Sequence, residues 1–185
     1  MTASTVKSTK VSNNDTAPRT VNASGKDGGL LKVSVDTAEA ATTSLDETGD
    51  VILMCPVDSH TRVHSLKIYN DDLDTGGTSG AVDVGLYNGP EAFTTSAGTL
   101  YAAYAVIDAD AFASAITTLT AANTAGVDIT HESLVSDLAD VGEKVWEVAG
   151  LPEDPKRKFC IGITVTTAMT TPAAGSIALK VQHSD

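Results

Sequence analysis

Three aspartates in a glycine-rich segment are spaced like the ligands of a calcium loop. Asp72, Asp74 and Asp83 fall at the first, third and twelfth places of such a loop, and Gly77 falls at the sixth, where the chain must turn sharply. Two departures count against the metal. The fifth place is Gly76, which has no side-chain ligand, and the twelfth is a short Asp rather than a bidentate Glu. We therefore interpret the segment as a solvated turn.

No other residue pattern predicts catalysis or metal binding. Four histidines lack any metal-binding spacing: His60, His64, His131 and His183. Asp58, Ser59 and His60 are adjacent in sequence, and neighbouring side chains of an extended chain point apart, so they do not predict a catalytic triad. Nucleophile-elbow and phosphate-binding glycine motifs are absent from the sequence. We expect no enzyme activity and no cofactor.

Charge is divided unevenly along the 185 residues, whose formal net charge is −12. Residues 1–28 carry a net charge of +2, which leaves −14 for the remainder. Such an acidic body repels phosphate, so we expect no direct nucleic-acid binding. The basic residues of the first segment are Lys7, Lys10, Arg19 and Lys26.

Residues 1–28 are polar and have almost no large apolar side chains, so they predict an N-terminal arm before a single domain at residues 29–185. The arm is either a flexible tail or a segment that orders along a neighbouring subunit. The chain has neither a secretory signal nor a membrane-length apolar run, which indicates a cytosolic protein without a membrane partner. We accordingly expect Cys55 and Cys160 to remain thiols.

Strand-like alternation is clearest on either side of the aspartate turn. Leu66 and Ile68 alternate before it, and Val82, Val84 and Leu86 alternate after it, which predicts two neighbouring strands, each buried on one face, joined by an exposed loop.

Further runs predict a mainly β fold, an antiparallel β-sandwich or jelly roll of about seven strands. The runs are LLKVSVD from residue 30, VILMC at 51–55 as a strand buried on both faces, KVWEV at 144–148, and alternating apolar residues at 159–165 and 177–181.

One or two short helices are expected between the strands. The alanine-rich segment 108–116 predicts a helix capped by Asp108 or Asp110, and the apolar spacing of 133–142 predicts another that ends at Gly142. Trp146 has apolar neighbours and is expected in the core.

Ordered blocks of this sequence resemble small virion proteins of tailed bacteriophages. The blocks are SLKIYNDDLDTGGTSGAVDVGLYNG, IDADAFASAI, KVWEVAGLPEDP and GITVTTAMTTPAAGSIALKV, and together they span about residues 50–182. The resemblance implies a structural protein of the virion, a capsid decoration or cement protein whose partner is the major capsid protein. It also implies the capsid exterior as location, the host cytoplasm as site of assembly, and a homo-oligomer, either trimer or dimer.

Within this resemblance, we hypothesise that the body oligomerises through sheet edges while residues 1–28 lie over capsid protein. Lys7, Lys10, Arg19 and Lys26 are the candidate capsid contacts. Two alternatives stay open: a tail, neck or fibre component, and a carbohydrate-binding β-sandwich. The low aromatic content, 4% of residues, counts against the second, because sugar-binding surfaces usually contain exposed aromatic rings.

Overall fold

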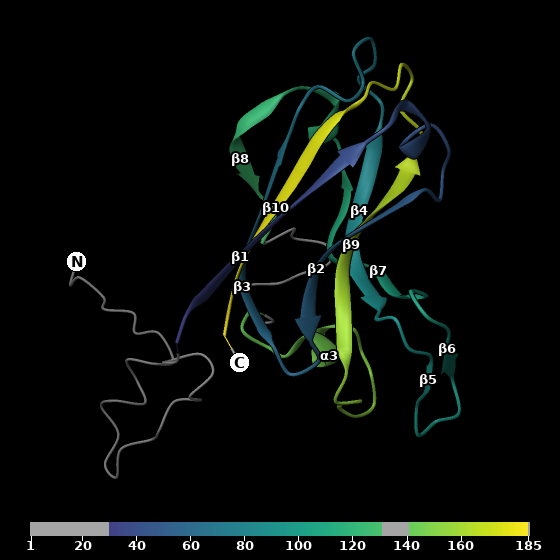
Figure 1. Cartoon of the computed structure of the whole chain (residues 1–185), viewed down its shortest axis with the longest axis vertical. Helices are drawn as coiled ribbons and strands as arrows, with labels where there is room; N and C mark the ends of the chain where they lie inside the picture. Colours follow the sequence, from purple (N-terminus) through teal and green to yellow (C-terminus); the bar gives the residue numbers. More distant parts are fainter. Residues whose placement is uncertain (1–29, 131–140, 185) are drawn as a thin grey trace, which may run out of the picture.

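Two four-stranded antiparallel sheets form a sandwich in the computed structural model, which describes residues 30–130 and 141–184 (Figure 1). The first sheet has the order β1 (Lys32–Ala40), β10 (Gly175–Ser184), β3 (Arg62–Asn70) and β8 (Asn123–Asp128). The second has the order β2 (Val51–Asp58), β9 (Lys158–Thr167), β4 (Ala81–Asn88) and β7 (Val106–Ile116). The prediction of a mainly β, antiparallel sandwich is confirmed.

Aliphatic side chains from the central strands of both sheets make the core. They alternate along each strand, so that one face of each sheet is apolar. The innermost residues are at most 1% exposed: Leu66, Ile68, Val82, Val84, Leu86, Ile161, Ile163, Val165, Ile177, Leu179 and Val181. Every residue of this set was predicted as an inward-facing strand residue, and burying such side chains supplies most of the driving force for folding.

The segment around the aspartate turn is not a hairpin between neighbouring strands. β3 belongs to the first sheet and β4 to the second, so residues 71–80 cross from one sheet to the other. Leu73 and Asp74 in this connection are 0% and 1% exposed, so the expectation of an exposed, solvated loop is wrong for them. A long connection is needed because packed sheets lie about 10 Å apart.

The expected helix at 108–116 is also wrong, because these residues form most of β7. Alanine favours helices, but pairing with β4 overrides that local preference. The pairing is irregular: Val84 lies opposite Ala113, and Leu86, two residues on, lies opposite Asp108. Five residues of β7 therefore span two of β4, and β7 bulges outward.

Gly85 of β4 lies directly beneath this bulge. A Cβ atom at Gly85 would be 2.2 Å from the carbonyl oxygens of both Asp108 and Ala109. The approach of β7 thus requires glycine, and β4 is covered on its outer face as well as its inner one, rather than on one face as expected.

Strand β2 is less buried than predicted, whereas β4 is more buried than predicted. It was expected to be buried on both faces, but Val51 and Leu53 are 43 and 38% exposed, and β2 is an edge strand of its sheet. Pro56 lies at a bulge in its pairing with β9, as a residue without an N–H group requires. Cys160 lies opposite Pro56, and both Cys55 and Cys160 are thiols.

The smaller elements lie at the two ends of the sandwich. They are η1 (Thr42–Ser44), η2 (Thr118–Thr120), the short hairpin of β5 (Phe93–Thr94) and β6 (Leu100–Tyr101), and α3 (Val145–Val148). The segment 144–148 was predicted as a strand, but it forms α3, where the N–H of Lys144 donates to Glu147 at 3.0 Å. Trp146 packs against the core, as expected.

Two expectations fall outside the described residues. The helix predicted at 133–142 is described only at its last two positions, 141 and 142, which are turn residues. The predicted arm, residues 1–28, is not described, so its boundary with the domain stays a prediction.

We predict that Gly85→Ala lowers the free energy of unfolding by about 2–3 kcal/mol, because the added methyl meets backbone that cannot rotate away. Gly76→Ala is the matched control: its Cβ would meet the hydroxyl of Thr171 at 2.9 Å, a group that can rotate. Urea unfolding of both variants checks this. If both variants lose the same free energy of unfolding, the close approach of β7 does not require glycine at position 85.

Candidate interaction surfaces

The three aspartates of the calcium pattern bind backbone groups instead of one another. Asp72 accepts the N–H of Asp74 at 3.3 Å, and Asp74 Oδ1 accepts the N–H of Thr171 at 2.6 Å. Asp83 lies in β4 and accepts the N–H of Ala115 at 2.7 Å. Within the described residues, no three His, Cys, Asp or Glu side chains are grouped so that they could hold a metal ion.

One end of the sandwich is exclusively acidic in its charged residues. Its loops, residues 41–50, 71–80, 117–122 and 168–174, are joined by backbone hydrogen bonds, for example from Leu73 to Leu119 at 3.1 Å. We call these loops the acidic end; they lie at the top of Figure 1. They contain six carboxylates and no Lys or Arg: Asp46, Glu47, Asp50, Asp71, Asp72 and Asp74. This end attracts cationic partners and repels phosphate.

Histidines lie near the opposite end of the first sheet. His64 Nε2 contacts the Ser184 hydroxyl at 2.9 Å, and His183 Nε2 contacts the Ser34 hydroxyl at 3.0 Å. Burial lowers the pKa of His64, and the charges of Arg62 and His183 lower it further. His131 lies outside the described residues.

The Asp58–His60 segment does not form a triad. Ser59 donates its hydroxyl to Asp154 at 2.5 Å, and the N–H of Lys156 donates to the same carboxylate at 2.8 Å. Burial would raise the pKa of Asp154, but these two hydrogen bonds, together with the charges of His60 and Lys144, lower it below its ordinary value. The contact fastens the loop before β9 to the turn between β2 and β3, which is a structural task.

A pair of acidic residues lies in the β7 bulge. Burial raises the pKa of Asp108, and a side-chain hydrogen bond with Asp110 raises it further. Both residues were expected to cap a helix; instead the N–H of Asp110 points to the Asp108 carboxylate at 3.4 Å.

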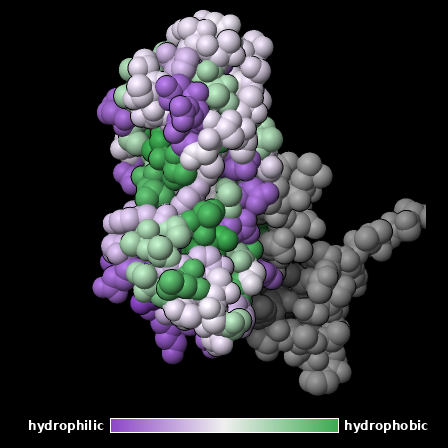
Figure 2. All heavy atoms as spheres, turned by 90° about the vertical axis from the view of Figure 1, so that its right-hand side faces the viewer, coloured by the Kyte–Doolittle hydropathy of each residue, from purple (hydrophilic) through white to green (hydrophobic). Residues whose placement is uncertain are grey.

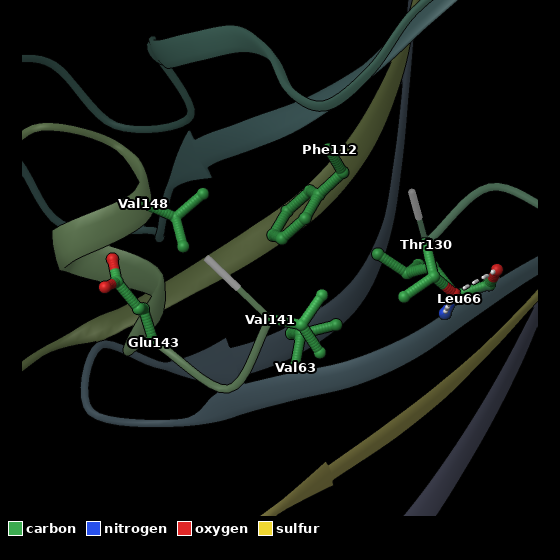
Figure 3. Close-up of a pocket in the computed structure, with 7 residues that line it drawn as sticks. All are labelled: Val63, Leu66, Phe112, Thr130, Val141, Glu143 and Val148. Atoms are coloured by element: carbon green, nitrogen blue, oxygen red, sulfur yellow. Dashed lines mark hydrogen bonds between the residues drawn. The ribbon is translucent and has the colours of Figure 1, made fainter. Parts of the chain in front are cut away.

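Among the hollows of the described residues, one is closed and apolar and another is an open groove beside a charged loop. The first is a cavity of about 10 Å³, room for roughly one water molecule, lined mainly by apolar side chains such as Val63, Phe112 and Val148 (Figure 3). The second is an open groove of about 540 Å³ between the β5–β6 hairpin and residues 153–157. In that groove the Arg157 guanidinium lies 5.1 Å from the centre of the Phe93 ring and donates to the carbonyl of Ala92 at 2.9 Å.

Exposed apolar side chains gather on strands at the margins of the sheets. Strand β1 and the residues before it contribute the largest group: Leu30, Leu31, Val33 and Val35, which are 77, 55, 53 and 66% exposed. We call these four residues the β1 stripe. A second group, Leu100, Tyr104 and Val106, lies around β6 and the start of β7, on the side of the molecule shown in Figure 2, where hydrophobic residues are interspersed with polar ones. Exposed apolar patches mark interaction sites.

Sequence reasoning identified the β1 strand but not which face is exposed. Its alternate residues Ser34 and Asp36 are half-buried, with Asp36 accepting the N–H of Cys55 at 3.0 Å, while the valines point outward. Alternation of this kind predicts two faces but does not indicate which of them is exposed. The candidate contacts Lys7, Lys10, Arg19 and Lys26 all lie outside the described residues.

No helix in residues 30–130 and 141–184 is long and apolar enough to cross a membrane. No protein-family model matches the sequence, and no curated protein matches it.

Two solved structures from bacteriophages contain chains with a similar fold. One is the capsid asymmetric unit of cyanophage Pam1: the TM-score is 0.52 and the identity 16%, over 85% of this chain and 86% of that chain. The other is the capsid of Ralstonia phage GP4, with a TM-score of 0.52 and 19% identity over 83% of this chain and 84% of that chain. At these identities the similarity shows a shared fold.

We predict that stability falls as the pH is lowered from about 7.5 to 5.5, partly because of His64. Its pKa in the folded chain lies below the ordinary value of 6.5, so the folded state disfavours protonation and loses stability as the pH falls through that ordinary value. The variant His64→Gln keeps a partner for Ser184 and cannot titrate. Thermal unfolding at both pH values checks this: the wild type should lose more, and an equal loss in the variant would refute the assignment.

Proposed function

We propose that this chain is a structural protein of a bacteriophage virion, which binds the outside of the capsid and stabilises the shell as a decoration or cement protein. The carrying observation is the fold shared with chains of two phage capsid structures over 83–85% of this chain. The ordered blocks that resemble tailed-phage virion proteins support the same role independently, because they come from sequence alone.

Several features of the described chain suit a shell component. It is a β-sandwich whose exposed apolar residues lie at the margins of its sheets, where a neighbouring subunit can reach them. Its acidic end discourages contact with the packaged genome. A homo-oligomer, dimer or trimer, would match the local symmetry of a shell.

Residues 1–28 are proposed to hold the protein on the capsid. Their net charge of +2 contrasts with −14 for the rest, so they can approach an acidic capsid surface that repels the body. The major capsid protein is the proposed partner, and Lys7, Lys10, Arg19 and Lys26 are the proposed contacts.

Copy number separates this role from the tail, neck or fibre alternative. Quantitative mass spectrometry of purified virions should give hundreds of copies, in a fixed ratio to the major capsid protein. A dozen copies or fewer would place the chain in the tail or neck, and finding no copies would show that it is not part of the virion.

For the carbohydrate-binding alternative, the described residues offer only Tyr104 as an exposed aromatic side chain, so we expect no binding on a glycan array.

We predict that the variant Lys7→Gln, Lys10→Gln, Arg19→Gln, Lys26→Gln binds empty capsids at least about 10-fold more weakly in co-sedimentation, because several charge contacts are lost. Wild-type binding should itself weaken as salt is raised. Lys67→Gln with Lys180→Gln is the matched control, since these cations face one another across β3 and β10 in the body. Unchanged binding of the arm variant, or equal loss in the control, would overturn the role of the arm.

A further inference from the structure

We propose that the β5–β6 hairpin and the turn after it form a second capsid contact, in which Leu100, Tyr104 and Val106 pack on an uncharged, apolar area of the capsid surface. This inference rests on the proposed function and deepens it. The basic residues of the arm supply charge contacts, and the hairpin supplies an apolar one. We call residues 92–107 the hairpin segment.

Tyr104 occupies a turn position at which glycine is usual. The N–H of Ala105 donates to the carbonyl of Ala102 at 3.2 Å, which closes a four-residue turn, and Tyr104 is the third residue of this turn, with a φ of 58°. A positive φ is unfavourable for a residue with a bulky side chain, and such strain is concentrated at functional sites. Because Tyr104 is 51% exposed, burial of its ring offsets little of the strain. A contact with another molecule accounts for the ring better than folding does.

The hairpin segment is fixed to the sandwich by buried hydrogen bonds. Asn88 is 0% exposed, and its side-chain amide donates to the carbonyl of Ala102 at 2.7 Å. Its backbone N–H donates to the carbonyl of Ala105 at 2.8 Å, and the N–H of Tyr104 donates to the carbonyl of Gly89 at 3.0 Å. Because the segment is already ordered, little conformational entropy is lost when a partner covers it.

The solvent-facing side of the hairpin segment is apolar and uncharged. Residues 92–107 contain no Asp, Glu, Lys, Arg or His. Leu100, Tyr104 and Val106 are 68, 51 and 49% exposed. Covering them is favourable in proportion to the apolar area that is removed from water. An uncharged surface is not repelled by a partner of either sign, so this part of an acidic protein can approach an acidic capsid.

The hairpin segment lies at the end of the sandwich from which the arm starts. Strand β4 leads from the acidic end to the hairpin, and β10 leads from the acidic end to the residues paired with the start of β1. In Figure 1 the acidic end is at the top, β5 and β6 lie at the lower right, and β1 begins at the lower left. The six carboxylates of the acidic end are therefore far from the proposed contact.

The arm makes the capsid the favoured partner of this surface. Once residues 1–28 are bound, the hairpin segment is tethered close to the capsid at a high effective concentration, so that a weak apolar contact is sufficient. A second copy of the chain has no such tether. The neighbouring loops at this end also contain Lys144, Lys156 and Arg157, whereas the acidic end contains no Lys or Arg.

Salt separates the two contacts in co-sedimentation of the full-length chain with empty capsids. At about 1 M salt, where charges are screened beyond about 3 Å, the arm should contribute little, whereas an apolar contact persists. We therefore expect binding to fall as salt is raised and then to level off at a residual value. Loss of all binding at high salt would overturn the inference.

The residual binding should depend on the ring of Tyr104. Tyr104→Asn removes the ring, and Asn tolerates a positive φ, so this variant should fold and bind at least about 10-fold more weakly at high salt. Leu100→Ser tests the same surface at a second exposed site and should also weaken binding. Tyr104→Phe keeps the ring and should bind like the wild type. Circular dichroism checks that each variant folds.

Val127→Thr is the matched control for loss of an exposed apolar side chain. Val127 is 40% exposed and lies on β8 in the first sheet, whereas the hairpin segment leads into β7 of the second. This variant should bind capsids like the wild type at every salt concentration.

Hydroxyl-radical footprinting of the capsid-bound chain locates the contact directly. Leu100 and Tyr104 should be protected from oxidation when the chain is bound. Val51, which is 43% exposed and follows directly after a loop of the acidic end, should stay reactive. Protection of Val51 without protection of the hairpin segment would overturn the inference.

The inference and the proposed function fail in different ways. Equal high-salt binding of Tyr104→Asn and the wild type, or an equal loss in Val127→Thr, would overturn the inference and leave the proposed function intact. If Tyr104→Asn binds capsids normally but loses self-association in sedimentation velocity, the hairpin segment joins copies of the chain, and the inference is wrong. If the wild type binds capsids at no salt concentration, the proposed function fails and this inference fails with it.

Discussion

The covering of β4 on both faces is the constraint on which the second sheet depends. Val82, Val84 and Leu86 fill the core on one side, while on the other side the backbone of β7 passes over Gly85 and Tyr87 contacts Thr164 of β9. Because only glycine permits that approach, the largest of the three register shifts between β4 and β7 lies at this position. In the strand order of this sheet β4 is an internal strand, and β2 and β7 are the edges.

The edges that result are closed in different ways. β7 is bent by its bulge, and β2 has Pro56, which removes one donor, and Asp36 of β1, which binds the N–H of Cys55. Asp36 reaches from β1 to β2 with its side chain, while the backbone of β1 pairs with β10 on its other side.

The sequence predicts strands well where apolar residues alternate over long runs, and poorly where local preference and pairing disagree. Ile161, Ile163 and Val165 could be assigned to the core because a period of two has one interpretation. The alanine-rich residues of β7 could not, since their helical preference yields to pairing with β4, which no local pattern records. The run at 144–148 was too short to separate a strand from one helical turn. In β1, the alternation of apolar residues with Ser34 and Asp36 predicts two faces of the strand. It does not predict which of these faces is exposed to solvent.

The acidic end and the exposed apolar residues lie at opposite ends of β1. The acidic end is next to Ala40, the last residue of β1, whereas Leu30, Leu31, Val33 and Val35 lie before the strand or in its first half. Beyond a screening length of about 8 Å at physiological salt, charges at the acidic end act only weakly on groups elsewhere. The fold therefore keeps its exposed apolar side chains on this strand apart from its densest negative charge.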